Sequence, residues 1–177
     1  YGECLELVSI AQDAQGAEVV RPWVEKAGTT FRTLLDRHNV VGKAFGLKAL
    51  PIGILIDEAG HLARPVGDIN IDRGSVREEI EEWVVNDRIP AAWHAMEWKD
   101  APQDLTPDEA EADARLQLAI VLLDRDQKDA AVAELQRAFR LDPANYLIRK
   151  QLWAIEHPEA FYAGRVNYDW QLEQMAR

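Results

Sequence analysis

Apolar and polar residues alternate near the start of the chain in a way that predicts a β-strand. The stretch LELVSIAQD alternates from Leu5 through Ile10, with apolar side chains on both of the faces that a strand would present. Strands of parallel sheets are covered on both faces, so this pattern predicts a strand buried on both sides. The short run FRTLLD, residues 31–36, predicts a second strand.

Two segments with helical spacing follow these strands in alternation. AEVVRPWVEKAG repeats apolar residues at the period of a helix and ends at Gly28, which we expect to stop that helix. Pro22 fits only if it lies in the first turn, because a proline inside a helix removes a hydrogen bond. DRHNVVGKAFGL predicts a shorter helix with Gly46 as its C-terminal cap.

An apolar run after Pro51 predicts a β-hairpin. The run IGILID, the turn DEAG and the run HLARPVGD have the composition of two strands joined by a polar turn. Pro51 lacks an N–H group, so it suits the first position of such a strand. Ser75 then begins the predicted helix SVREEIEEWVV, with Glu78 completing a capping box. The expected order is strand, helix, short strand, helix, hairpin, helix.

The pattern changes after residue 86. Pro90, Pro102 and Pro107 interrupt the periodicity, so we expect a first domain over 1–88, a linker over 89–105 and a second domain over 106–177. The second domain begins with two amphipathic helices, TPDEAEADARLQLAIVLLDRD and KDAAVAELQRAFRLDP. Thr106 and Glu109 predict a capping box, and NYLIRKQLWAIEHP predicts a third helix.

Charge and cysteine content narrow the functional classes. The 177 residues contain 20 Lys and Arg against 31 Asp and Glu, a net charge of −11, so we do not expect nucleic acid as a partner. No apolar stretch reaches the roughly 20 residues that cross a bilayer, and the start YGECLELVSI lacks the basic region of a signal peptide. Cys4 is the single cysteine, which excludes an internal disulfide and a cysteine-based zinc cluster. The single cysteine does not determine the cellular compartment of the protein.

Residues that could carry other chemistry have simpler structural explanations. Cys4 reads as a small apolar strand residue. The four histidines show no i, i+4 pair, so we expect no metal site, and no Gly-rich phosphate loop or other cofactor signature follows a strand. A paired-carboxylate hydrolase is conceivable, but we interpret the acidic residues around the predicted hairpin as turn residues: Asp57, Glu58, Asp68 and Asp72.

Aromatic residues are concentrated in the predicted linker. Trp93, His94 and Trp98 suggest either an aromatic ligand pocket or, as we favour, aromatic side chains that hold two domains together.

The segments LELVSIAQD, VRPWVEKAGTTFRTLLD and VVGKAFGLKALPIGILIDEAGHLARPVGD occur in an order that resembles the later part of a thioredoxin-like domain of the TlpA or ResA type, whose relatives include peroxiredoxins. The resemblance covers roughly residues 4–85 and implies an α/β fold, with a thioredoxin-like sheet flanked by helices. It implies that Pro51 is a cis-proline and that the backbone of Leu50 and Pro51 docks a substrate peptide. The segment 17–35 resembles the insertion of the TlpA and peroxiredoxin groups.

The catalytic motif of that family is missing from these residues. Thiol–disulfide exchange uses a C-x-x-C at a helix start, and the 177 residues contain none. We therefore assign no catalytic residue within the chain and expect the motif upstream of Tyr1. Without that first strand and helix, the sheet would have an open edge and an uncovered apolar face.

The second half resembles one tetratricopeptide unit, which implies an all-α helical hairpin tail. The matching positions are Leu118, Ala119, Leu122, Ala131, Leu135, Ala138 and Pro143. A single repeat must pack its apolar face against the first domain or against a partner, and the aromatic stretch 153–170 could cap it.

Three functions follow as hypotheses. The leading one is a thiol–disulfide oxidoreductase that acts on protein thiols or disulfides; a peroxiredoxin is a more distant third hypothesis, since its reactive cysteine would also have to lie upstream. The alternative is a non-catalytic binding module, in which a thioredoxin scaffold carries a helical tail that recruits a protein partner. Tails of this kind resemble those of bacterial thioredoxin-like proteins, and self-association of the chain stays open.

Overall fold

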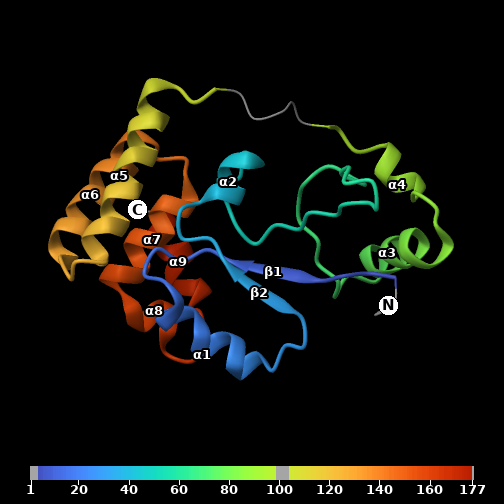
Figure 1. Ribbon diagram of the computed structural model, residues 1–177, viewed down its shortest axis with the longest axis horizontal. Coiled ribbons are helices and arrows are strands. Elements are labelled where there is room, and N and C mark those ends of the chain that lie inside the picture. Colours follow the sequence, from blue (N-terminus) through green and yellow to red (C-terminus); the bar gives the residue numbers. More distant parts are fainter. Residues whose placement is uncertain (1–3, 99–103, 177) are drawn as a thin grey trace.

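Two short parallel strands lie at the middle of the molecule in the computed structural model, which describes residues 4–98 and 104–176 (Figure 1). Strand β1 (Val8–Ala11) pairs with β2 (Arg32–Leu35) in a register that sets Val8 opposite Arg32 and Ala11 opposite Leu35. Helix α1 (Ala17–Ala27) connects the two strands. The β-α-β order expected for this part of the sequence is therefore present.

Helix α1 confirms one expectation and corrects another. Gly28 adopts the left-handed conformation, at φ 58°, and caps the helix as predicted, because a residue without a Cβ takes this conformation without strain. Pro22 lies inside α1 instead of in its first turn. It deprives the Glu18 carbonyl of a helical donor, and since both residues are exposed, water can replace that donor.

The predicted hairpin is present as an antiparallel turn, but its two arms are not regular strands. The segment 52–67 turns back on itself, but only two isolated antiparallel bridges join its arms, at Gly53–Gly67 and at Ile56–Leu62. Glycines at a bridge weaken a strand, and Pro65 has no N–H group to donate to a ladder. Neither arm pairs with β1 or β2 within the described residues.

The expected α/β fold, a thioredoxin-like sheet flanked by helices, is also wrong. The described part of the chain is mainly helical, and its sheet has two strands. The side chains of Val8 and Ile10 are 38% and 42% exposed, so β1 is not buried on both sides. Helices that flank a sheet must bury an apolar stripe against it, and α1 has no buried residue.

Three further helices belong to the first half of the chain. They are α2 (Val40–Ala44), α3 (Gly74–Asn86) and α4 (Ala91–His94). Helix α3 begins one residue before the expected cap: Arg73 is its N-cap residue, no side chain caps it, and Ser75 lies in its first turn. The capping box predicted at Ser75 and Glu78 is therefore not formed.

Residues 106–176 form the helical unit. Its helices are α5 (Pro107–Leu123), α6 (Lys128–Leu141), α7 (Tyr146–Glu156), α8 (Pro158–Tyr162) and α9 (Tyr168–Met175). The predicted capping box is confirmed: the Glu109 N–H donates to Thr106 Oγ1 at 3.3 Å and the Thr106 N–H donates to Glu109 Oε2 at 2.9 Å. Helix α5 packs on α6, α6 on α7 and α7 on α8.

The hydrophobic core lies within this helical unit. Ala131, Leu135 and Ala138 of α6 are fully buried, as is Ala119 of α5, so four of the positions matched to the tetratricopeptide pattern face the core. Leu118 instead lies on the exposed side of α5. The first half contributes Ala14 to this core.

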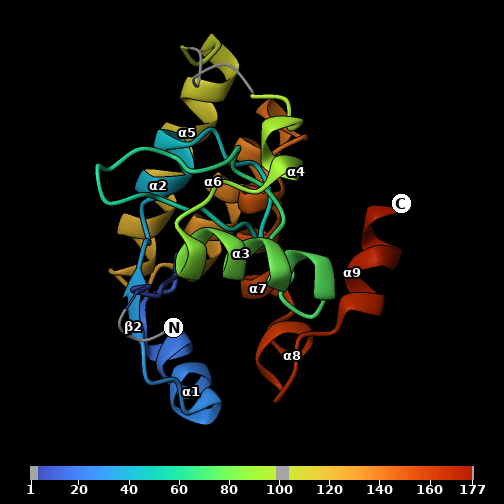
Figure 2. The same cartoon turned by 90° about the vertical axis from the view of Figure 1, so that its right-hand side faces the viewer.

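The two halves are joined along one side of the strands. Figure 1 places α5 and α6 at one end of the molecule and α3 and α4 at the other, with β1 and β2 between them. Figure 2, turned by 90°, again shows α1 close to α8. Lys26 Nζ at the end of α1 donates to the Gly164 carbonyl just after α8, at 2.7 Å. Gln151 Nε2 of α7 donates to the Gln12 carbonyl at 3.1 Å, so the helical unit also contacts the chain just beyond the carboxyl end of β1.

Candidate functional site

The predicted docking residues lie against the helical unit. The Leu50–Pro51 peptide bond is cis, as the family resemblance implied. Pro51 is exposed and Leu50 is half-buried. The Leu50 carbonyl oxygen accepts a hydrogen bond from Lys150 Nζ of α7 at 3.2 Å. The carbonyl group that the family resemblance assigned to substrate docking thus already accepts a hydrogen bond from within the chain. A docking role for Leu50 and Pro51 stays a prediction.

Helix α5 presents a polar ridge to the segment before Leu50. Glu109, Asp113 and Gln117 recur every four residues and so share one face of the helix. Their partners come from residues 38–48: Lys48 Nζ lies 2.5 Å from Glu109 Oε1, Lys43 Nζ 3.1 Å from Asp113 Oδ2, and His38 Nδ1 2.7 Å from Gln117 Oε1. Hydrogen bonds from Lys48 and then from Thr106 lower the pKa of Glu109 to about 2.

A second polar cluster lies just beyond the carboxyl end of β1. The Tyr162 hydroxyl donates to Asp13 Oδ2 at 2.6 Å and accepts from Gln15 Nε2 at 2.9 Å. Burial raises the pKa of Asp13 above its ordinary value, and burial together with the Asp13 carboxylate raises that of Tyr162. The position of Asp13 directly after a predicted strand could have drawn attention to it. No local signal marks Tyr162.

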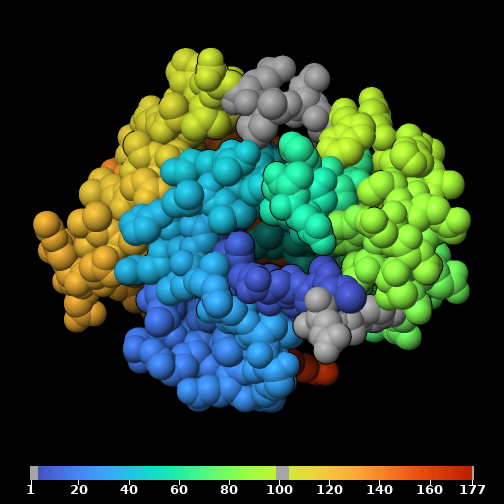
Figure 3. All heavy atoms as spheres, turned by 45° about the vertical axis from the view of Figure 1, so that its right-hand side comes forward, coloured from blue at the N-terminus to red at the C-terminus, as the bar shows by residue number. Residues whose placement is uncertain are grey.

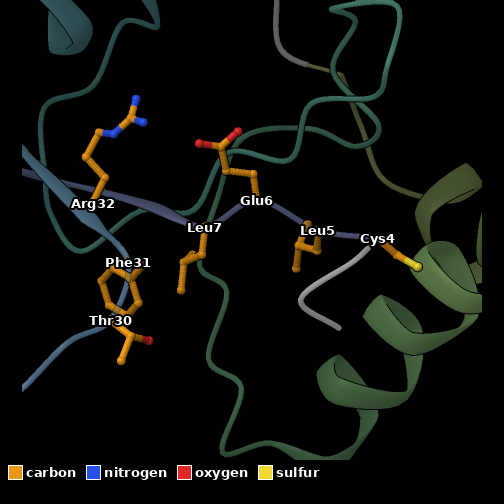
Figure 4. Close-up of a pocket in the computed structure, with 7 residues that line it drawn as sticks. All are labelled: Cys4, Leu5, Glu6, Leu7, Thr30, Phe31 and Arg32. Atoms are coloured by element: carbon orange, nitrogen blue, oxygen red, sulfur yellow. The ribbon is translucent and has the colours of Figure 1, made fainter.

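The amino ends of the strands open into a cleft of about 770 Å³. Figure 4 shows Leu7 and Phe31 pointing to one side of the backbone and Glu6 and Arg32 to the other, while Cys4 points toward α3. The Cys4 thiol is free and exposed. Figure 3 shows a further hollow between the dark-blue residues near β1 and the cyan-to-teal residues 40–60.

A narrower groove runs between α1 and β2. Ala17, Val20, Arg21 and Val24 line it from α1, and the three consecutive residues 33–35 line it from β2. Successive side chains of a strand point to opposite faces, so a groove that borders three residues in a row touches the backbone of β2 as well as its side chains. Its volume is about 180 Å³ and its lining is mainly apolar.

The other candidate residues do not converge. Among residues 4–98 and 104–176, no three His, Cys, Asp or Glu side chains are close enough to hold a metal ion. Asp57 is a turn residue, as predicted: its Oδ1 accepts from the N–H groups of Ala59 and His61. Asp68 pairs with Arg73 at 3.2 Å. Turn and ion-pair contacts therefore account for these two of the four acidic residues around the predicted hairpin.

The linker aromatics do not join the two halves as expected. Trp93 is buried, its ring centroid lies 5.7 Å from that of Trp83, and its Nε1 donates to Glu79 Oε2 at 2.7 Å. Trp93 therefore fastens α4 to α3 within the first half. Arg64 lies over the Trp93 ring at 5.7 Å, whereas Trp98 is exposed. Pro102 of the predicted linker lies outside the described residues.

In the described part of the chain, every helix is too short or too polar to cross a membrane. Comparison with protein-family models, with curated proteins and with solved structures gave no match.

Proposed function

We propose that this protein is a protein-binding module in which the helical unit supports the two strands as a docking surface. The observation that carries this proposal is the exposure of apolar side chains on the sheet. Ile10 lies opposite Leu34 in the register, on one face, and these side chains are 42% and 47% exposed. Apolar patches of this kind on a folded protein mark interaction sites, because water leaves them favourably when a partner binds.

The contacts of Leu50 are compatible with a binding function. The carbonyl that an oxidoreductase of the resembled family would offer to its substrate instead accepts from Lys150. Cys4 is the single cysteine in these 177 residues, so they cannot close an internal disulfide. Binding through exposed apolar side chains needs neither group.

A capture experiment with two matched variants tests this function. Ile10→Asp places a charge on the exposed face of β1, and Val121→Asp makes the same kind of change at an equally exposed apolar residue of α5. Each protein is immobilised and exposed to a lysate of the source organism. A captured protein is then identified by mass spectrometry, purified and titrated against all three proteins.

We expect a partner that binds wild type and the Val121→Asp variant saturably, and that binds the Ile10→Asp variant about tenfold or more weakly. Circular dichroism checks that both variants remain folded. If a partner binds all three proteins equally, or no protein binds wild type saturably, the strand surface is not the docking site.

A further inference from the structure

The outer edge of β2 has unpaired backbone groups. The Asp36 N–H donates to the Ala11 carbonyl at 2.8 Å, which directs the backbone groups of Asp36 toward β1. Backbone groups alternate in direction along a strand, so the N–H and C=O groups of Thr33 and Leu35 point away from β1. In the described part of the chain, β2 pairs with β1 alone, so these four groups have no strand partner.

The groove between α1 and β2 borders Thr33 and Leu35, the same two residues whose backbone groups point away from β1. An extended segment paired with β2 would place alternate side chains over the groove, where Val20, Val24 and Leu35 are only partly covered. Backbone pairing would supply affinity, and the apolar groove would select the side chain that enters it. A peptide suited to this surface would be extended and would carry an apolar residue at every second position.

Arg21 adds a charge requirement. It is exposed, it lines the groove, and it forms no ion pair within the described residues, although the chain contains 31 acidic residues. A carboxylate on the incoming peptide would give this guanidinium a partner, whereas a lysine would be repelled.

We infer that the outer edge of β2 binds an extended peptide of a partner protein, with apolar and acidic residues in alternation. This inference rests on the proposed function and specifies the partner for the same strand layer. The peptide adds a strand beside Thr33 and Leu35, its apolar side chains enter the groove against Val20 and Val24, and a carboxylate pairs with Arg21.

Three peptides probe this mode of binding. The first is an acetylated hexapeptide that alternates valine and aspartate, the second alternates valine and lysine, and the third repeats the first with N-methyl groups at alternate amides, which block strand pairing. Each is titrated into the ¹⁵N-labelled full chain, and backbone amide shifts are followed by NMR.

We expect the valine–aspartate peptide to shift the amides of residues 17–24 and 32–36 saturably, and the other two to bind at least about tenfold more weakly. Arg21→Glu should weaken binding of the first peptide about tenfold. Arg125→Glu makes the same charge change at an exposed arginine after α5 and should leave binding within about twofold.

Equal binding of the N-methylated peptide would exclude strand addition, and equal binding of the lysine peptide would exclude recognition through Arg21. Sedimentation that shows a dimer dissociated by Arg21→Glu would mean that a second copy occupies the edge, and would overturn a partner peptide. If the captured partner depends on Ile10 but not on Arg21, the groove inference fails while the proposed function stands. If it depends on neither, both fail.

Discussion

Lys150 Nζ donates a hydrogen bond to the Leu50 carbonyl oxygen at 3.2 Å, across 100 positions of sequence. Lys150 lies on α7, and burial lowers its pKa. The contact therefore links the helical unit to the loop around Leu50 and Pro51, to which the family resemblance assigned substrate docking. It holds that loop at the cost of partly desolvating an ammonium group.

Replacing Lys150 by methionine tests this link. Lys150→Met keeps an apolar stem but removes the donor, so the Leu50 carbonyl loses its partner. We expect faster hydrogen–deuterium exchange in residues 46–54, with a change in unfolding free energy below about 1 kcal/mol, because the lost hydrogen bond and the relieved desolvation oppose each other. Lys128→Met, at an exposed lysine, is the control. Unchanged exchange in 46–54 would contradict a holding role.

The Tyr162–Asp13 hydrogen bond should stabilise the join between the two halves. Tyr162→Phe removes two hydrogen bonds of the hydroxyl and leaves the half-buried Asp13 carboxylate short of a donor, so we expect a loss of about 1–3 kcal/mol in unfolding free energy, measured with urea. Tyr168→Phe, at an exposed tyrosine, should change stability by less than about 0.5 kcal/mol. Tyr162→Phe should also raise the pKa of Asp13 further, because the hydrogen bond from Tyr162 favours the charged form of that carboxylate.

The Glu109 carboxylate should account for part of the stability that the folded protein loses at acidic pH. Its pKa is about 2 in the folded protein against an ordinary value of 4.5, so its contribution to stability is present above pH 4.5 and is lost as the pH falls toward 2. Glu109→Gln can keep the capping box but removes the charge. We expect the stability difference between wild type and this variant to be largest near pH 7 and to shrink toward pH 2, as measured by urea unfolding.

Asp108→Asn provides the control for the acid experiment, because Asp108 lies in the same first turn of α5 and makes no ion pair in the described part of the chain. If the stability difference between wild type and Glu109→Gln stays constant between pH 7 and pH 2, the contact with Lys48 does not depend on the charge of Glu109.

The core of the helical unit should be sensitive to cavities. Leu135 is 0% exposed, so Leu135→Ala should lower the unfolding free energy by about 2–5 kcal/mol. Leu118 is 46% exposed on α5, and Leu118→Ala should cost less than about 0.5 kcal/mol. Both changes in unfolding free energy are measured by urea denaturation at pH 7. Similar costs at the two positions would mean that α5 packs in a different orientation.

Local signals in the sequence determined most of the helices. The capping box of Thr106 and Glu109, the left-handed Gly28 and the apolar spacing in 107–141 each act within a few residues, so the sequence alone locates the helices that depend on them. The same holds for the Asp57 turn, where one side chain accepts from backbone groups next to it. Such contacts need no knowledge of the rest of the fold.

Tertiary structure decided how the strands pair and what lies against them. The apolar run after Pro51 was compatible with a sheet strand, yet its only antiparallel bridges in the described part of the chain are to its own return segment. The alternation in 5–10 located β1 but could not tell which of its faces another element would cover. Tyr162 and Lys150 reach Asp13 and Leu50 from more than 90 residues away. The energy of such contacts depends on which surfaces meet after folding, and the periodicity of one segment carries no information about that.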